Sequence, residues 1–427
     1  MVADRWWVLC LVLICTWLPA VASAQDTVRS IVFEGLKRTQ PAVLFRFVES
    51  EPGTLADSLT IAEDAQRLQN LPFLSQVQPR LDSGGVLCFV VEEAWTQFPL
   101  ANFGGVRGNV WVQLGYTDAN LLGRGLQLSV FGQLNDGRPG GQLYLRVPYL
   151  GRSRWGTTLS MVHLASTEPL YFDNQFDDQP VFYNYDNLSL GATALFARKH
   201  NETWELGATY FVERYRKDQR HEGLMTPGPA QARIPKLLFK ASHQMGVVNR
   251  YAHQFQGWDL TQYAQTICDL PDRSWFYIYW ADARWFQRLG SSQRLNLAMR
   301  MRAGLSTNLS TPFAPFVLDS HVNLRGSGNR VDRGTGVLTW NVELRQTFWE
   351  PWRIALQGVA FSDMGSWRQP GGQLNDLLQP DNIQQFVGLG MRLVLKPANN
   401  AVLRADYGVD LFSPDQRGLV LGLGQYF

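Results

Sequence analysis

The stretch Leu338–Arg345, with the sequence LTWNVELR, contains the pattern that decides the fold. Its apolar residues are Leu338, Trp340, Val342 and Leu344, and they alternate with the polar residues Asn341, Glu343 and Arg345. Because successive side chains of a β-strand point to opposite faces, this period predicts a strand with one apolar and one polar face. The same period recurs from about Thr96 onward, for example in residues 295–302 and 403–410. The sequence therefore predicts a large β-structure over residues 95–427.

Three observations favour a membrane barrel over a soluble β-sandwich, whose strands also alternate. The alternating segments have about ten residues, which is the length a tilted strand needs to cross the hydrocarbon. Short and long connections alternate, as periplasmic turns and extracellular loops do. The short ones are residues 199–202, 249–253 and 397–400, and the long ones are 167–186, 216–233, 306–335 and 364–385. Tyr426 and Phe427 also follow directly after the alternating Leu419, Leu421 and Leu423, and an aromatic residue at the end of the last strand predicts a C-terminal outer-membrane insertion signal.

Strand count and composition agree with this interpretation. Counting back from Phe427 predicts sixteen strands, an even number as in bacterial barrels. Aromatic residues make up 12% of the chain, with 15 Trp, 14 Tyr and 24 Phe, while mean hydropathy is negative at −0.17. Aromatic girdles around a wet interior produce this mixture. The net charge of +2 gives no electrostatic footprint for nucleic acid, so we expect no nucleic-acid partner.

Residues 1–24 predict a signal peptide. An interrupted apolar run over residues 6–21 is followed by the small residues 22–24 (ASA), a pattern that a signal peptidase cleaves. An uncleaved anchor is the alternative, but the run is short for a membrane span. We expect export, with the mature chain beginning at Gln25. No later stretch of about 18 uninterrupted apolar residues occurs, so the sequence predicts no membrane-spanning helix.

Residues 25–94 predict a small α/β domain with the order β-α-α-β-β. The expected strands are residues 28–34, 73–78 and 86–92, and the expected helices are residues 41–48 and 58–70. The segment 82–85 (DSGG) between the last two strands predicts a hairpin turn. Such a sheet has a free edge strand that is able to accept an extended peptide by backbone pairing.

Enzyme chemistry has little support in the sequence. No serine-hydrolase elbow, phosphate loop or zinc-protease motif occurs. The six histidines lack ligand spacing. We therefore expect no catalytic residue, no metal and no cofactor, although a Ser–His pair between barrel strands, as in a phospholipase-like barrel, stays open. The two cysteines after the signal peptide, Cys88 and Cys268, lie in different predicted domains and predict no disulfide.

The α/β domain resembles a polypeptide-transport-associated (POTRA) domain. The resemblance rests on the element order and on residues 33–35 (FEG), 71–73 (LPF) and 90–92 (VVE). It implies a periplasmic domain that holds unfolded or extended client polypeptides. A spacer domain with no partner is the alternative.

The rest of the chain resembles the outer-membrane assembly and translocation superfamily that includes BamA, TamA and the two-partner secretion transporters, also described as bacterial surface antigens. The motifs are residues 118–125 (DANLLGRG), 324–326 (LRG), 361–365 (FSDMG), 388–392 (GLGMR) and 403–408 (LRADYG). The resemblance implies a mainly β fold, a 16-stranded antiparallel transmembrane β-barrel preceded by one POTRA-like domain. It also implies a Gram-negative outer-membrane location with that domain in the periplasm.

A loop that folds into the barrel is the first candidate site. The inward loop motif consists of Leu324, Arg325 and Gly326, and its predicted lumenal partners are Glu343, Asp363 and Gly365. An arginine inside a narrow lumen is costly unless carboxylates pair with it, and Arg fits bidentate pairing better than Lys. The resemblance implies the same pairing. An ordinary solvated loop arginine is the alternative.

A lateral seam between the first and last barrel strands is the second candidate site. Its residues are Pro99, Gly104 and Gly105 in the first strand, and Gly422 and Gly424 in the last. Proline removes a ladder donor and glycine weakens strands, so this seam is a candidate for opening to admit a client strand. Glycine that serves close packing is the alternative.

Two functions remain. In the first, the protein assists insertion or translocation of polypeptides, and its partners are outer-membrane lipid, client polypeptides and accessory lipoproteins. In the second, it is a passive pore or surface barrel that keeps the fold without that activity. The POTRA-like domain favours the first. The single domain indicates an accessory or specialised member, and Ser327, where the family has an aromatic residue after Arg-Gly, argues against full translocation activity.

Overall fold

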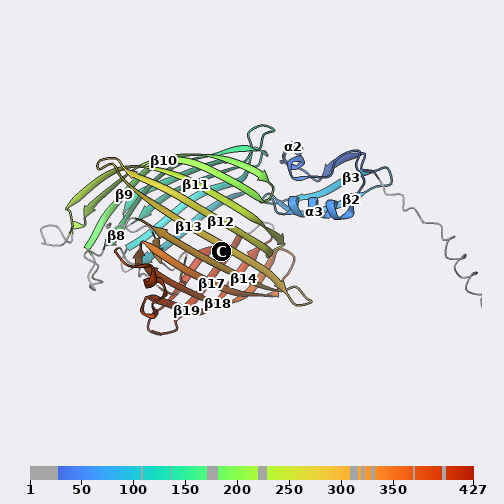
Figure 1. Ribbon diagram of the computed structural model, residues 1–427. Coiled ribbons are helices and arrows are strands. Elements are labelled where there is room, and N and C mark those ends of the chain that lie inside the picture. The colour runs from blue at the N-terminus through green and yellow to red at the C-terminus, as the bar shows by residue number, and fades with distance from the viewer. Residues whose placement is uncertain are drawn as a thin grey trace, which may run out of the picture.

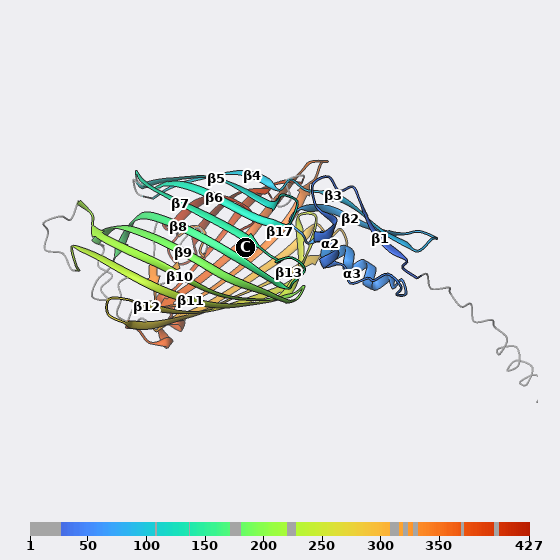
Figure 2. The ribbon, with the colours of Figure 1, turned by 90° about the horizontal axis from the view of Figure 1, so that it is seen from above.

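The computed structural model describes residues 27–106, 109–135, 137–170, 181–219, 228–307, 316–318, 323–327, 332–368, 371–396 and 401–427. The predicted signal peptide at residues 1–24 lies outside this range. The described chain forms a small α/β module followed by a large sheet that curls into a barrel (Figures 1 and 2).

The α/β module has the predicted element order. Its elements are β1 (Ser30–Glu34), α2 (Pro41–Leu44) continued by a 3-10 turn η2 (Phe45–Phe47), α3 (Ser58–Gln69), β2 (Leu74–Leu81) and β3 (Val86–Glu93). The central strand β3 is parallel to β1 and antiparallel to β2. Helix α3 begins where the Asp57 carboxylate accepts hydrogen bonds from the Leu59 and Thr60 amides, a standard N-cap. Fully buried side chains, among them Leu44, Leu68 and Phe89, form the core between the helices and the sheet.

The barrel sheet contains sixteen strands, which confirms the predicted number. They are β4 (Gln97–Val106), β5 (Asn109–Leu121), β6 (Leu126–Asn135), β7 (Arg138–Val147), β8 (Trp155–Leu170), β9 (Val181–Lys199), β10 (Glu202–Lys217), β11 (Gln231–Tyr251), β12 (Gln254–Asp269), β13 (Ser274–Leu289), β14 (Leu295–Ser306), β17 (Gly336–Trp349), β18 (Ile354–Arg368), β19 (Ile383–Leu395), β20 (Ala401–Asp410) and β21 (Arg417–Leu423). Neighbours in the chain pair antiparallel, and β4 and β21 stand at the two ends of the ladder.

Three smaller pieces lie between the late barrel strands. The pair β15 (Phe316–Leu318) and β16 (Asp332–Gly334) forms a two-stranded sheet within the segment that joins β14 to β17. The 3-10 turns η4 (Leu374–Leu378) and η5 (Pro380–Asn382) join β18 to β19.

The predicted alternation separates the two faces of the barrel. Apolar and aromatic side chains such as Trp275, Tyr277 and Leu419 are exposed on the outer face. Polar residues such as Asp282 and Arg300 lie on the inner face and pair there. This is the distribution that a hydrocarbon outside and a wet lumen inside require. Among the residues that the structure describes, no helix combines the length and apolar character needed to cross a membrane.

Several strands are longer than the predicted ten residues. Strands β8, β10, β12 and β13 have 16 residues each, β9 has 19 and β11 has 21. About ten residues suffice to cross the hydrocarbon, so these strands continue beyond it. A cluster of buried side chains, Val181, Tyr183 and Tyr215, stabilises the far end of β9 and β10.

The end of the chain departs from the prediction that the terminal aromatics extend the last strand. Strand β21 ends at Leu423, and Gly424 has a φ of 83°. Residues 424–427, called the terminal tail below, turn into the lumen, and the C-terminus lies within the barrel outline in both views (Figures 1 and 2). Tyr426 is buried there, against lumenal side chains. Whether Tyr426 and Phe427 act as an insertion signal stays a prediction. Cys88 and Cys268 are both free and buried.

Candidate functional site

The loop motif Leu324-Arg325-Gly326 lies buried inside the barrel. The Ser327 amide donates to the Leu324 carbonyl across 3.3 Å, so the motif forms a tight turn. Gly326 has a φ of 101°, a conformation that a side chain disfavours. Leu324 is fully buried beside Val337, Trp367 and Phe386 on the barrel wall. The turn is therefore anchored by an apolar residue on one side of the arginine and shaped by glycine on the other.

The Arg325 guanidinium makes a side-on pair with Asp363. Its Nε and Nη2 donate to the two carboxylate oxygens, each across 2.8 Å, and the Arg325 amide donates to Oδ2 across 3.0 Å. Its Nη1 donates to Glu343, and all three side chains are 0% exposed. The structure thus brings together the arginine and the two carboxylates that the sequence singled out. A bidentate pair in which all three guanidinium nitrogens donate to carboxylates is the arrangement that offsets the desolvation of a buried arginine.

The strand register explains why both carboxylates face the arginine. Asn341 on β17 stands opposite Asp363 on β18, and Glu343 stands opposite Phe361. These four residues share the inner face because they are two positions apart on each strand. The Asn341 amide donates to Asp363 across 2.9 Å and to the Asn323 carbonyl across 2.7 Å. It therefore holds both the carboxylate and the start of the loop turn.

Further charges extend the pair into a network on β17, β19 and β20. Arg345 donates to Glu343 across 2.5 Å. Arg392 donates to both oxygens of Asp406, across 2.6 and 3.1 Å, and lies 3.4 Å from Glu343. We call these six residues the arginine node: Arg325, Arg345, Arg392, Glu343, Asp363 and Asp406. In the sequence, Arg345, Arg392 and Asp406 stand out only as polar members of alternating strands. That pattern indicates the inner face of a strand but does not predict a contact.

Two aromatic rings enclose the Arg325 guanidinium. The carbon Cζ lies 3.7 Å from the centre of the Phe361 ring and 4.0 Å from that of Tyr426. Cation–π contacts of this kind are worth about 2 kcal/mol or more where the cation is desolvated. Tyr426 also lies under Arg404, at 4.9 Å. The terminal tail thus closes the face of the node that the carboxylates leave open.

Glycines allow the loop backbone to touch the barrel wall. A Cβ on Gly408 of β20 would lie 2.2 Å from the Arg325 carbonyl, and one on Gly418 of β21 would lie 3.2 Å from that of Gly326. Gly365 leaves room for the Leu324 side chain, 3.0 Å from its Cβ position. Gly365, predicted together with the carboxylates as a lumenal partner of the loop, thus has Leu324 as its nearest neighbour. The turn therefore contacts β17, β18, β20 and β21. It also reaches β19, where the Leu324 side chain packs against Phe386.

The remaining tail residues cross the lumen. Gln425 donates to Gln357 of β18 across 3.2 Å, and Arg345 donates to the Phe427 carbonyl across 3.2 Å. The Phe427 ring lies 6.4 Å from Phe286 of β13. The tail thereby links the strand at one end of the ladder to strands several places away.

The predicted seam residues lie at the two ends of the ladder. Pro99, Gly104 and Gly105 belong to β4, Gly422 belongs to β21 and Gly424 follows it. Gly422 leaves space for Arg404, whose Nε lies 2.5 Å from its Cβ position. This contact gives one of the glycines a packing role.

The module docks on the barrel segment 118–125 through Asp118, which lies near the end of β5. This fully buried carboxylate accepts from Arg38 of the module across 2.7 Å and from Thr96 across 2.8 Å. Asn120 donates to Thr39 across 2.9 Å. Gly123 has a φ of 69°, and a Cβ there would lie 2.0 Å from the Arg38 carbonyl. The DANLLGRG segment is therefore the seat of the module as well as a turn.

Within the module, Glu93 holds the loop that contacts the DANLLGRG segment. Glu93 accepts hydrogen bonds from the amides of Lys37, Arg38 and Thr39. Partial burial alone would raise its pKa, but these amides outweigh that effect, and the pKa lies below its usual value. The ionised Glu93 thus fixes the loop that presents Arg38 to Asp118.

Further contacts lie near the ends of β7, β9 and β11. Asn70 donates to Asn249 across 2.9 Å, and Arg250 donates to the Gln69 and Leu74 carbonyls across 2.5 and 2.6 Å. Phe47 of the module packs against Tyr149 and His200, with ring centres 6.0 and 5.8 Å apart. The module is thereby fixed at several points around the barrel mouth.

The fold and the buried loop define an outer-membrane β-barrel with an inward arginine loop. Residues 120–427 match the model of the Omp85 superfamily domain, and the chain belongs to that superfamily. No curated protein sequence matches the chain significantly.

Solved structures share the fold at low identity. The chain resembles BamA from Haemophilus ducreyi lacking POTRA domains 1–3, with 15% identity and a TM-score of 0.54 over 92% of this chain and 83% of that one. It resembles CdiB from Acinetobacter baumannii with 14% identity and a TM-score of 0.59 over 93% and 73%. For CdiB from Escherichia coli the values are 13%, 0.50, 95% and 92%. The superfamily is one of Gram-negative outer-membrane proteins with a general role in polypeptide insertion or translocation.

Proposed function

We propose that this protein assists the insertion or translocation of polypeptides at the outer membrane. Extended clients are held by the module, a POTRA-like domain spanning residues 25–94 in the periplasm, and are passed to the barrel. The observation that carries the proposal is the clamp between the loop turn and the C-terminal strands. Through Asp363, Gly408 and Gly418, the turn holds β18, β20 and β21 together.

Because of this clamp, the two strands of the seam, β4 and β21, are held differently. Strand β21 is held from inside by the loop and by the terminal tail. Strand β4 begins directly after the module, and Thr96 just before it shares Asp118 with Arg38. In our proposal β21 is the fixed side of the seam. Strand β4, weakened by Pro99 and its glycines, is the side that moves when a client strand enters.

The module sheet offers an edge beside the barrel mouth. Its outer strands are β1 and β2, and Ser75 and Gln76 of β2 line a cavity at the mouth. Pro79 has no N–H, which limits pairing along the later part of β2. We therefore place the client on the part of β2 around Gln76, where an extended segment is added by backbone pairing.

Reconstitution tests the proposed activity. Proteoliposomes containing the full-length protein receive an unfolded outer-membrane protein diluted from urea, and its insertion is timed against empty vesicles. We expect faster insertion. A passive barrel is the alternative function, favoured by Ser327 in place of an aromatic residue, and it predicts no acceleration together with steady ion conductance in a planar bilayer.

A reversible lock tests the seam. A cysteine pair that joins β4 to β21, in a background without Cys88 and Cys268, should abolish the acceleration when oxidised and return it when reduced. Full activity of the oxidised protein would refute lateral opening. Folding is controlled in the same sample, because the reduced form carries the same substitutions.

Photo-crosslinking tests the client path. A photoreactive residue in place of the exposed Gln76 should capture the client during insertion. The same residue in place of Glu63, on the exposed side of α3, is the matched control. Equal capture at both positions would remove β2 from the path.

A further inference from the structure

Arg250 is a buried cation that has no carboxylate partner among the residues that the structure describes. This residue is 5% exposed at the end of β11, where the module covers it. Its Nη2 donates to the Gln69 and Leu74 carbonyls, whereas Nε and Nη1 are buried without a hydrogen-bond partner among the described residues. Burying an arginine without a carboxylate or full hydrogen bonding is costly. Such a group points to a partner that completes it.

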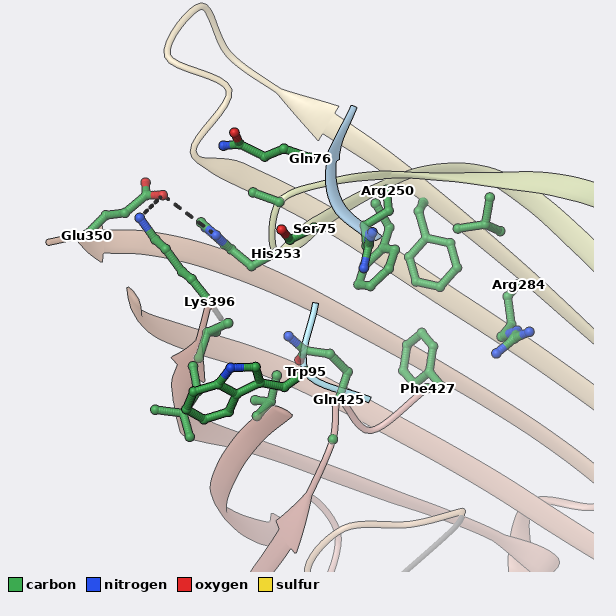
Figure 3. Close-up of a pocket in the computed structure, with 18 of the residues that line it drawn as sticks. Ser75, Gln76, Trp95, Arg250, His253, Arg284, Glu350, Lys396, Gln425 and Phe427 are labelled. Atoms are coloured by element: carbon green, nitrogen blue, oxygen red, sulfur yellow. Dashed lines mark ion pairs between the residues drawn. The ribbon is translucent and has the colours of Figure 1, made fainter. Parts of the chain in front are cut away.

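Two other cations that line the same cavity, both more exposed than Arg250, have carboxylate partners. Arg284 pairs with Asp259, its Nε lying 2.9 Å from Oδ1. Lys396 lies 2.9 Å from Glu350. Figure 3 shows the Glu350–Lys396 pair on one side of the cavity and Arg250 on the other. The unpaired charge is therefore local to the wall where the module meets the barrel.

A cavity of about 900 Å³ adjoins Arg250 at this junction. Its volume is within the range of sites that enclose a small ligand or a short segment of chain. Aromatic side chains line it together with the charged residues, namely Trp95, Phe255, Phe286, Trp352 and Phe427. The wall thus combines apolar surface with a buried guanidinium that lacks some of its hydrogen bonds. Such a wall fits a ligand that carries an anionic group next to apolar groups.

The position of the cavity indicates whether the anionic ligand is a polypeptide or a lipid. Ser75 and Gln76 of the edge strand β2 line it (Figure 3). The carbonyl of the preceding Leu74 accepts from Arg250. An extended segment added to β2 at Gln76 therefore has its side chains beside Arg250. The cavity lies at the mouth of the lumen, because the lumenal residues Gln425 and Phe427 form its opposite wall. A polypeptide fits this site better than a lipid of the surrounding bilayer does.

We propose that Arg250 binds a carboxylate of an extended client polypeptide in this cavity, so that the protein selects segments with an acidic residue between apolar ones. The inference rests on the proposed function and names a feature of its substrate. Binding supplies the acceptor that the guanidinium lacks, and it does so where the client passes from the module to the barrel.

The test is a binding comparison between two peptides. Both are nine-residue peptides of alternating Leu and Thr, acetylated, amidated and fluorescently labelled, with Asp or Asn at the central position. Binding to the full-length protein in nanodiscs is measured by fluorescence anisotropy. We expect the Asp peptide to bind about tenfold or more tightly than its Asn twin, the ratio expected for hydrogen bonds to a charged group. Arg250→Gln should reduce this ratio below about twofold.

A matched variant separates binding from docking. Asn249→Ala removes the adjacent hydrogen bond to Asn70 and loosens the same contact without changing the guanidinium, so it should keep the Asp preference. Equal affinity for both peptides in the native protein would overturn the inference, as would a preference that survives Arg250→Gln. Laurate binding with no peptide binding would overturn it in favour of a lipid site.

The insertion assay keeps the two proposals apart. Accelerated insertion without any Asp preference would reject the carboxylate site and leave the proposed function standing. An Asp preference in a protein that does not accelerate insertion would reject the function while Arg250 remains an anion-binding residue.

Discussion

The two sides of the barrel wall use the same ion-pair chemistry at very different degrees of burial. On β17 and β18, Arg325 meets Glu343 and Asp363, and all three side chains are 0% exposed. On β7 and β10, Arg146 meets Glu205 at 2.8 Å, the same distance as Arg325 to Asp363, but these side chains are 34% and 20% exposed. Distance alone does not distinguish the pairs.

Burial decides how much each pair matters. A partly exposed pair loses most of its attraction to solvent screening and contributes about 0–1 kcal/mol. Removing one partner of a fully buried pair leaves an uncompensated charge and costs about 3–5 kcal/mol. The side of the barrel that holds the loop is therefore the side where one substitution has a large effect. The following predictions test that contrast.

Arg325→Gln should have the largest effect. It leaves Glu343 and Asp363 facing each other without the arginine between them, so we expect a loss of about 3–5 kcal/mol. The measurement is urea unfolding of the detergent-solubilised barrel followed by tryptophan fluorescence. Arg325→Lys should recover only part of the loss, because lysine cannot make the side-on pair. An unchanged midpoint for Arg325→Gln would contradict a structural role for the node.

Tyr426→Leu should have the second largest effect. Leucine keeps apolar bulk but removes the ring that covers the Arg325 guanidinium, so we expect a loss of about 2 kcal/mol. Hydrogen exchange in β21 should increase, because the tail holds that strand to the node. Tyr426→Phe, which retains the ring, is the matched control and should lose less. Equal losses for both variants would assign the effect to the hydroxyl group instead of the ring.

Much of the fold was predictable because the pattern that encodes it is local. Alternation as in Leu338–Arg345 specifies both the strand and its inner face, so the sixteen strands follow from the sequence. Strand length was less predictable. Residues such as Tyr183 and Tyr215 keep β9 and β10 paired beyond the membrane by packing on each other, and that contact joins distant parts of the chain.

The site was predictable only in part for the same reason. Glu343 and Asp363 were found because each lies on an inner face of a strand close after the loop. Arg392 and Asp406 lie on inner faces too, but nothing local says which inward charges meet. The terminal tail was mispredicted because the alternation continues through Leu423. The turn at Gly424 depends on contacts of Tyr426 with Arg325, which lies about a hundred residues earlier.

Docking of the module on the barrel should depend on pH, because His200 lies at the junction between them. His200 lies in a turn against Phe47 of the module. Burial, and then the nearby Arg67, hold its pKa below the usual value, against the opposing effect of Glu49 and Asp64. The docked state therefore binds a proton less readily than the undocked state. Docking should be fully favourable above about pH 6.5 and should weaken as the pH falls through that value to the lowered pKa.

Hydrogen exchange of module residues at pH 7.5 and 5.5 measures this effect. His200→Gln should make exchange less dependent on pH. Stronger docking at pH 5.5 would contradict the sign of this shift.

Arg146→Gln should have the smallest effect, and it is the most demanding test of the contrast. The Arg146–Glu205 pair has the length of a strong ion pair, but water reaches both side chains, so we expect a change below about 1 kcal/mol. Unfolding should be measured beside Arg325→Gln at low and high salt, where only a screened pair responds to salt. A loss as large as that of Arg325→Gln would mean that the lumen near β7 and β10 is as poorly solvated as the arginine node. Burial would then no longer explain why the two sides differ.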